Sequence, residues 1–388
     1  MKNKNLVFSI IALVGIIILL IIPTGFEKQI YKNSYSAKGK VLNINESSIY
    51  NTGMIKQGNQ VCEIKILNGK HKGKVVWANN LLSGKLEADK LFKVNEKALV
   101  LVEMDSKGEI TGANVVEHYR LGKIVILVLV FFLLLGLLGG VTGIRTILSF
   151  IFTIVTIWKI LIPLLLKGYS PMLVGIAIGS VISLVTLILV SGFTKRTYAA
   201  ILGALISSIL TCVLGSLATS IFNIDGVIMQ WSESLLYAGF ESLDLTGIYK
   251  ASIYLSCSGA ILDLAIDISA AIEELYINNK EISKKDILKS GMNISRSVLG
   301  TQTTTLLLAY LGSFICVMMV YMAQGTPFIN ILNSQFISSE IVHTFIGCIG
   351  LVIVCPITTI ICGKIYTDGS NFKNIVKKSI VYNSFWKI

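Results

Sequence analysis

Long apolar runs separated by short polar connections dominate the chain after residue 120. The runs lie near 123–141, 144–166, 171–193, 198–222, 248–272, 300–323 and 340–362. Each is close to the roughly 20 residues that a helix needs to cross a lipid bilayer. One more apolar run, Leu6–Ile22, follows a short basic start, and no small-x-small cleavage pattern comes after it. The pattern predicts an all-α membrane bundle of about eight helices, with residues 1–24 as an uncleaved anchor.

Residues 25–119 follow a different pattern, in which short segments alternate between apolar and polar positions. Segments such as QVCEIKIL and KALVLVEMD have the period of half-buried strands. Asn68-Gly69 and the segment Asp105–Glu109 are typical of hairpin turns. We expect a small antiparallel all-β domain of about five strands, barrel-like and close to an OB-fold in size. The predicted domains are therefore 1–24, 25–119, a multi-spanning domain at 120–364 and a basic tail at 365–388.

The distribution of charge predicts which side of the membrane each connection faces. The chain carries 34 basic and 22 acidic residues, a net charge of +12. Lysine and arginine gather in the connections 194–196 and 276–297 and in the tail, whereas 223–246 contains acidic but no basic residues. Cytoplasmic loops of membrane proteins are enriched in Lys and Arg. Both termini and the 276–297 loop are therefore predicted to be cytoplasmic, and the 25–119 domain external.

The apolar run Ala251–Leu275 is interrupted by carboxylates. At about 100° per residue, Asp263, Asp267 and Glu274 fall on one helical face, and two serines lie earlier on that face. A carboxylate in hydrocarbon costs roughly 2.5–3.5 kcal/mol, so this face is expected to contact protein or water. Three interpretations are open. The face is an ion, proton or substrate site, or it packs against a helix that supplies a cation, or its acids are wet near the cytoplasmic surface.

These residues also carry a resemblance. The segment GAILDLAIDISAAIEEL resembles a signature of the YibE/F family of bacterial membrane proteins, in which a GA-x-x-D-x-A-x-x-I pattern recurs. The segments Ile162–Gly175, Ser295–Ser313 and Ser339–Thr359 are similar to the same family. The resemblance covers most of the chain. It implies a multi-spanning protein of the bacterial cytoplasmic membrane and no particular activity.

Two further polar groups are candidates for the same site. Thr301, Gln302, Thr304 and Thr305 open an otherwise apolar run. Their hydroxyls either line an ion path or bond back to carbonyls of their own helix, and the sequence does not decide between these alternatives. Glu340 and His343 are neighbours on one helical face because they are three residues apart.

The topology places Glu340 and His343 near the external surface and the aspartates toward the cytoplasm, so the two groups form either two gates or one site. The resemblance implies a glutamate at Glu340 and a basic residue at the position of His343. The histidine makes the charge at this position dependent on pH.

Some features have mainly structural interpretations. Lys159 lies within an apolar run and either extends to the interface or pairs with a carboxylate. The pairs Gly136/Gly140 and Gly175/Gly179 have the spacing of close helix contacts. Val227–Phe240 is too short to span a bilayer and is predicted to be an interfacial or re-entrant segment.

The chain offers little evidence for enzymatic chemistry. It contains no P-loop, HExxH motif or nucleophile elbow, and its seven cysteines include no CxxC pair. We therefore expect no metal, cofactor or nucleic acid. The leading hypothesis is a secondary transporter or permease for an ion or small solute, using the acidic face. The alternative is a non-transporting receptor or assembly factor whose external domain binds a partner protein.

Overall fold

The computed structural model describes residues 2–27 and 33–367. Internal contacts divide the chain into two compact units. One unit is Glu27–Leu134, and the other combines the segment before it with the chain from Leu135 onward. Nearly all of the predicted basic tail, from residue 368 to 388, lies outside the described residues.

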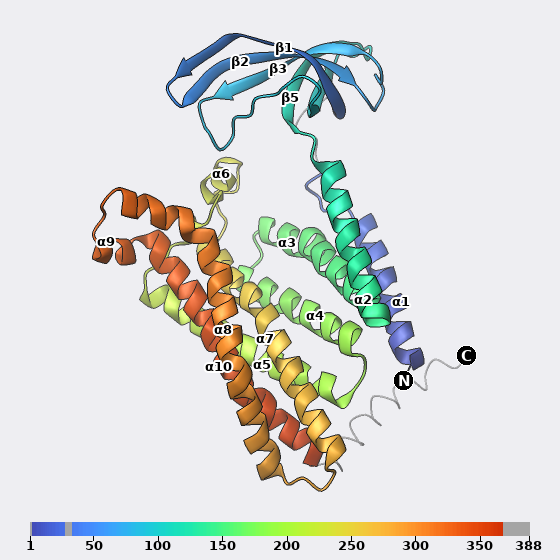
Figure 1. Cartoon of the computed structure of the whole chain (residues 1–388), viewed down its shortest axis with the longest axis vertical. Coiled ribbons are helices and arrows are strands. Elements are labelled where there is room, and N and C mark those ends of the chain that lie inside the picture. The colour runs from blue at the N-terminus through green and yellow to red at the C-terminus, as the bar shows by residue number, and fades with distance from the viewer. Residues whose placement is uncertain (1, 28–32, 368–388) are drawn as a thin grey trace. The chain divides into compact units, whose positions relative to one another are not determined.

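The smaller unit contains the predicted β barrel, which the structure confirms (Figure 1). Its strands are β1 (Ser34–Thr52), β2 (Ile55–Ile66), β3 (Val75–Ser83), β4 (Lys97–Met104) and β5 (Ile110–His118). They close in the order β1-β2-β3-β5-β4. The expectation of purely antiparallel pairing is wrong at one junction. β3 and β5 run parallel and pair only at Asn79 and Asn114 within the described residues, because five strands cannot close into a barrel with every neighbouring pair antiparallel.

The period of two in the sequence determines which side chains fill the barrel. Val41, Ile64 and Val100 are fully buried, and their chain neighbours point outward. The predicted turns are present, with Gly69 and Gly108 at φ of 82° and 83°. Glycine adopts this left-handed conformation without the steric cost of a Cβ. Asp89 holds another turn, because the backbone N–H groups of Ser83 and Gly84 donate to its carboxylate and keep its pKa below the usual range.

A buried amide fixes the long connection between β3 and β4. Gln60 is fully buried, and its Nε2 donates to Glu46 Oε1 and to Phe92 O, both at 2.9 Å. Its Oε1 accepts from Phe92 N at 2.9 Å and from Asn80 Nδ2 at 3.1 Å. Fully satisfied buried networks of this kind select one conformation, because each unpaired member would be costly.

We expect the excised domain 25–119 to fold and Gln60→Ala to lower its free energy of unfolding by roughly 2–3 kcal/mol, since several buried groups lose their partners. Urea unfolding followed by circular dichroism measures the change. The control is Lys56→Ala at an exposed position of the same strand, which should change the unfolding free energy little. A coil-like spectrum of the unmodified domain would contradict an independent barrel.

The larger unit is helical. Its helices, with the one that enters it from the barrel, are α1 (Lys2–Ile21), α2 (Leu121–Thr156), α3 (Ile162–Leu166), α4 (Pro171–Ser191), α5 (Lys195–Ile221), α6 (Ser232–Tyr237), α7 (Leu245–Asn278), α8 (Lys284–Ala323), α9 (Phe328–Asn333) and α10 (Gln335–Thr367). A π-helical turn, η1, covers Ile157–Leu161, and a 3₁₀ turn, η2, covers Gly226–Ile228. Within the described residues, seven helical stretches are long and apolar enough to cross a membrane.

The count depends on one stretch, Leu121–Leu166, which is 46 residues long. A straight helix of that length measures about 69 Å, more than twice the hydrocarbon thickness of a bilayer. The backbone leaves the helical region at Gly140, with φ 53° and ψ −132°. This break falls where the two predicted runs 123–141 and 144–166 meet.

One of the two predicted glycine contacts is confirmed. A Cβ at Gly175 would lie 3.0 Å from Ala251 Cβ, and one at Gly179 would lie 2.5 Å from Tyr254 Cε1, so α4 packs closely on α7. The prediction for Gly136/Gly140 is wrong within the described residues, because no group of another helix lies within 4 Å of a Cβ at either position. The spacing reflects the break at Gly140 instead of a helix contact.

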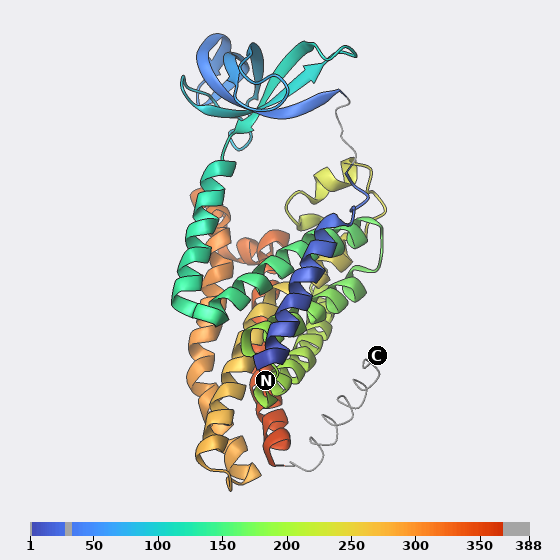
Figure 2. The same cartoon turned by 90° about the vertical axis from the view of Figure 1, so that its right-hand side faces the viewer.

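The prediction of a loop at 276–297 is also wrong for most of these residues. α8 begins at Lys284, and only Asn279–Ser283 connects it to α7. Figures 1 and 2 show α7 and α8 side by side and joined at one end. Ser283 caps α8 by accepting from Asp286 N at 3.2 Å. The first turns of α8 are polar, and their charge concealed the helix from a search for apolar runs.

Lys159 reaches the end of another helix, which fits the alternative in which it extends toward the interface. Its Nζ donates to Ile22 O at 3.0 Å, directly after the last residue of α1. A cation is favourable there because the carbonyl end of a helix is partly negative. Lys159 lies within η1, four residues before Pro163. Proline lacks an N–H and its ring crowds the carbonyl four residues earlier, which accounts for the π-helical turn.

The segment Val227–Phe240 is short, as predicted. It forms only η2 and α6, which has six residues. Trp231 and Tyr237 are exposed, as aromatic side chains at a membrane interface are.

Candidate functional site

The candidate site is built on α7, the helix at the centre of the larger unit. Asp244 caps its start by accepting from Gly247 N at 2.7 Å. One face of α7 is the core of the unit, where Tyr254, Ile261, Leu264 and Ile268 are fully buried. Buried and polar residues recur along α7 with the period of the helix, so they lie on different faces.

The opposite face carries the predicted acids. Asp263, Asp267 and Glu274 are all exposed in the single chain, as is Ser256. We call these four residues the acidic seam. The structure thus places the predicted residues of α7 together on one side, one to two turns apart. No carboxylate of the seam forms an ion pair within the described part of the chain.

Neighbouring helices flank the seam without covering it. α4 contacts α7 at Tyr254 and Leu255. α8 and α10 reach α7 on its other side, where Leu306 and Cys257 lie beside Gly347. The seam occupies the remaining sector of α7, between these two sets of contacts.

One end of the seam meets a polar junction of three helices. Ser256 Oγ lies 2.5 Å from His343 Nε2. The ring of Tyr310, from α8, lies 4.8 Å from the His343 ring, and that of Tyr249 lies 6.4 Å from it. Tyr249 is itself fixed, because its hydroxyl donates to Ser339 O at 2.7 Å. We call Tyr249, Ser256, Tyr310 and His343 the histidine junction.

Sequence reasoning missed the two tyrosines of this junction. A tyrosine in an apolar run is usually a core residue, and no local pattern marks it as a neighbour of a histidine in another helix. Glu340 is half-buried, one helical turn before His343. Asp263 lies seven residues beyond Ser256, about 10 Å along the helix axis. The junction and the aspartates therefore form two levels, connected along α7.

The threonines of α8 have a more local role than an ion path requires. The hydroxyls of Thr301, Thr304 and Thr305 donate at 2.9 Å to Val298 O, Gly300 O and Thr301 O. These bonds match the alternative in which the hydroxyls bond back to their own helix. Each hydroxyl still has lone pairs that can accept. Gln302 is half-buried on the same turns.

A second polar cluster joins the other ends of three helices. Arg196 Nε lies 3.6 Å from Glu273 Oε2, and Tyr366 donates to Glu273 Oε1 at 3.2 Å. Lys195 Nζ lies 5.8 Å from the centre of the Tyr366 ring. The cluster brings together the start of α5 and the ends of α7 and α10. The sequence did not predict this cluster, since nothing in the segment of Arg196 signals Glu273.

The same end of the bundle contains the other basic segments. Phe193 N donates to Asn5 Oδ1 at 3.2 Å, which places the start of α1 beside the α4–α5 connection. A Cβ at Gly363 would lie 3.8 Å from Lys284 Cγ, which places the start of α8 beside the end of α10. Of the segments predicted to face the cytoplasm, the start of α1, the α4–α5 connection and the start of α8 therefore lie at the ends of helices where α10 also ends, within the described residues.

Residues 2–27 and 33–367 contain no group of three or more His, Cys, Asp or Glu side chains that could hold a metal ion. The cysteines there are free thiols. Burial and the nearby Glu46 raise the pKa of Cys62, in the barrel, to about 11, so its thiol is protonated and unreactive near neutral pH.

Comparison with known families identifies both units. A model described as YibE/F-like protein matches residues 127–368, and one described as YibE/F family N-terminal domain matches residues 29–118. The comparisons with curated proteins and with solved structures each gave no match. The two family models together cover the barrel and nearly all of the helices, so the chain belongs to the YibE/F family.

Proposed function

We propose that this protein spans the bacterial cytoplasmic membrane and moves a proton, a cation or a small solute along the acidic seam of α7. The observation that carries the proposal is the position of Asp263 and Asp267. Both lie exposed on a long apolar helix, on the side opposite its buried core.

The energetic argument excludes lipid as the neighbour of this face. Each carboxylate at the centre of a bilayer costs roughly 2.5–3.5 kcal/mol. Asp263 and Asp267 together make that face unfavourable in hydrocarbon, whereas α1 and the first part of α2 expose almost only apolar side chains. The seam is therefore expected to face water or another protein surface in the membrane, as groups on an ion pathway do.

The histidine junction provides a second station on the same path. Ser256 belongs both to the junction and to the seam, so the path would run from Glu340 and His343 to Ser256 and then about 10 Å along α7 to Asp263, a distance that water must bridge. Oxygen atoms are suitable ligands for hard cations. Histidine is the side chain that most readily takes up and releases a proton near neutral pH. The proposal requires no covalent chemistry.

The direct test is flux through the purified full-length protein in liposomes. Pyranine reports an imposed proton gradient, and separate assays use sodium and potassium gradients. We expect faster dissipation of at least one gradient than in empty liposomes. Equal rates for every gradient and every solute tested would favour the receptor alternative, which complementation by a fragment ending at residue 119 would support.

Orientation has its own test. Because the basic ends of the helices gather together, we expect a cysteine at Lys284→Cys to be protected in intact cells from a membrane-impermeant maleimide. Lys107→Cys, in the barrel, should be labelled. Both variants need Cys316→Ser, which removes an exposed native thiol. Labelling at position 284 and protection at 107 would reverse the proposed topology.

A further inference from the structure

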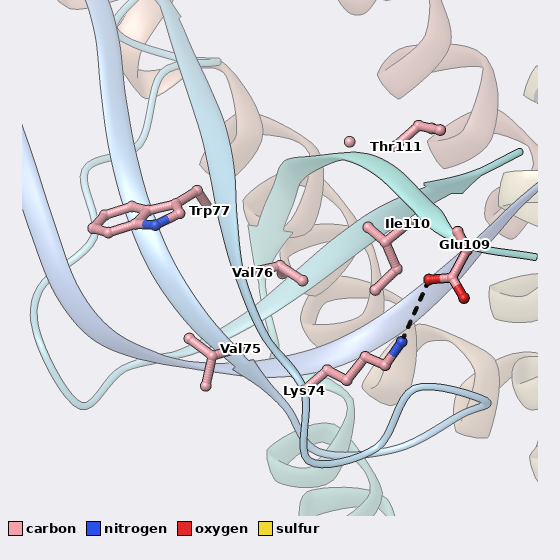
Figure 3. A pocket seen from close by; sticks show the side chains of 8 residues that line it. Lys74, Val75, Val76, Trp77, Glu109, Ile110 and Thr111 are labelled. Carbon is pink, nitrogen blue, oxygen red and sulfur yellow. Dashed lines mark ion pairs between the residues drawn. The ribbon is translucent and has the colours of Figure 1, made fainter.

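The barrel has an opening where β3 and β5 separate. The two strands pair only at Asn79 and Asn114. From there toward the start of β3, they line a cavity of about 350 Å³ that opens to the surface. Its walls are Lys74 with the first three residues of β3, and Glu109 with the first three residues of β5 (Figure 3). We call this opening the β3–β5 slot.

The backbone of β3 directs hydrogen-bonding groups into the slot. Ile66 N donates to Lys74 O at 2.9 Å, so the carbonyl of Lys74 faces β2. Groups alternate along a strand, and therefore Val76 also faces β2, while Val75 and Trp77 face the other side. Asn79 has the same parity and makes the bridge to β5. Among the described residues of the barrel, no strand pairs with Val75 or Trp77 on the slot side.

An unpaired strand edge is a template for another strand, and natural proteins usually cover or block it. Here the edge is flanked by apolar surface, because Val75 is 48% and Trp77 58% exposed on the outer face of β3. The ion pair between Lys74 Nζ and Glu109 Oε2, at 3.9 Å, crosses the slot. Both side chains are largely exposed, so the pair contributes little stability and opens readily.

The charges at the mouth define the chemistry of an occupant. The β2–β3 and β4–β5 turns lie together there, since His71 Nε2 lies 3.1 Å from Gly108 O. These turns present the exposed side chains of Lys70, Lys72 and Lys107. The same turn carries two acids: Asp105, whose carboxylate accepts from the backbone N–H groups of Lys107 and Glu109 at 2.9 and 2.8 Å, and Glu109, which pairs with Lys74. Lys70, Lys72, Lys74 and Lys107 outnumber these two acids. The mouth therefore attracts negative charge.

We propose that the β3–β5 slot binds an extended peptide segment of a partner protein, which adds to β3 as a strand and carries acidic residues at the lysine-rich mouth. Backbone hydrogen bonds to Val75 and Trp77 supply the affinity, and alternate apolar side chains pack on the exposed faces of these residues. An acidic residue of the peptide replaces Glu109 as the partner of Lys74. This interaction is separate from transport through the helices.

The test uses full-length protein in lipid nanodiscs and a nine-residue peptide of alternating Val and Thr with glutamates at both ends. Fluorescence anisotropy of the labelled peptide measures binding. We expect saturable binding that weakens at least tenfold when the central amides of the peptide are N-methylated. It should also weaken when lysines replace the terminal glutamates.

Two pairs of matched variants locate the site. Val75→Pro removes the slot-facing N–H at the first residue of β3, where the β2 ladder does not use it, and should abolish binding. Val75→Thr keeps the N–H and should bind normally. Lys74→Glu should weaken binding at least tenfold, and Lys85→Glu, in the β3–β4 connection, should not. Far-ultraviolet circular dichroism confirms that the variants fold.

Three results would overturn the proposal. The first is no saturable binding by the unmodified protein. The second is binding that persists after N-methylation or in folded Val75→Pro. The third is slow amide exchange at Val75–Trp77 that depends on protein concentration and not on peptide, which would show that a second copy of the barrel covers the edge.

Discussion

Asp263→Asn is expected to reduce flux through reconstituted protein to the level of empty liposomes, while expression and thermal stability stay close to those of the unmodified protein. Asparagine keeps the shape of the side chain but has no proton to release and no negative charge for a cation. The side chain is exposed and lies outside the core, so the amide needs no new packing. Flux, expression and thermal unfolding in detergent are measured on the same preparations.

The matched control is Glu241→Gln, which neutralises an exposed acid in the connection between α6 and α7. It should leave flux unchanged. Leu262→Ala is unsuitable as a control, because Leu262 is buried in the core and its truncation would create a cavity. Loss of stability in step with loss of flux in Asp263→Asn would make the seam a structural feature and remove the main support for transport.

Gly203→Val is expected to disrupt the packing of the helical unit strongly. A Cβ at Gly203 would collide with Thr358 Oγ1 and would lie 3.0 Å from Thr358 Cβ and 3.2 Å from its Cα. The neighbouring backbone must therefore move, which separates α5 from α10. Overpacking typically costs about 1–3 kcal/mol. Fluorescence-detected size-exclusion chromatography after heating measures the loss of folded protein.

Gly312→Val provides the comparison, because among the described residues no neighbouring group lies within 4 Å of a Cβ at Gly312 in α8. The two changes carry the same cost of a β-branched residue in a helix. We expect Gly312→Val to lose folded protein at nearly the temperature of the unmodified chain. Equal losses from both substitutions would mean that α5 and α10 do not meet at Gly203.

The barrel and the apolar helices were predictable because their patterns are local. Alternation with a period of two identified the strand segments, and runs near 20 residues identified most helices. The polar start of α8 was missed for a related reason. A helix that leaves the apolar region keeps its hydrogen bonds but loses the hydrophobic signal, and its capping serine, Ser283, is a weaker marker.

The candidate site, too, was predictable only where the signal lies within one helix. The positions of Asp263, Asp267 and Glu274 on one face of α7 follow from the helical period alone. The structure adds that this face lies opposite the core and between two flanking sets of helices. Thr301, Thr304 and Thr305 kept two interpretations until their hydrogen bonds to their own helix were visible.

The sequence by itself determined the family, the two kinds of domain and the acidic face of one helix, because composition and periodicity act within a single segment. Only the tertiary structure decided which segments meet. It joined Ser256 to His343 and Tyr310, and Arg196 to Glu273. It also showed that β3 and β5 do not pair between Asn79 and the start of β3. Such contacts depend on helix crossings and strand register, and residues far apart in the chain carry no local signal of their partners.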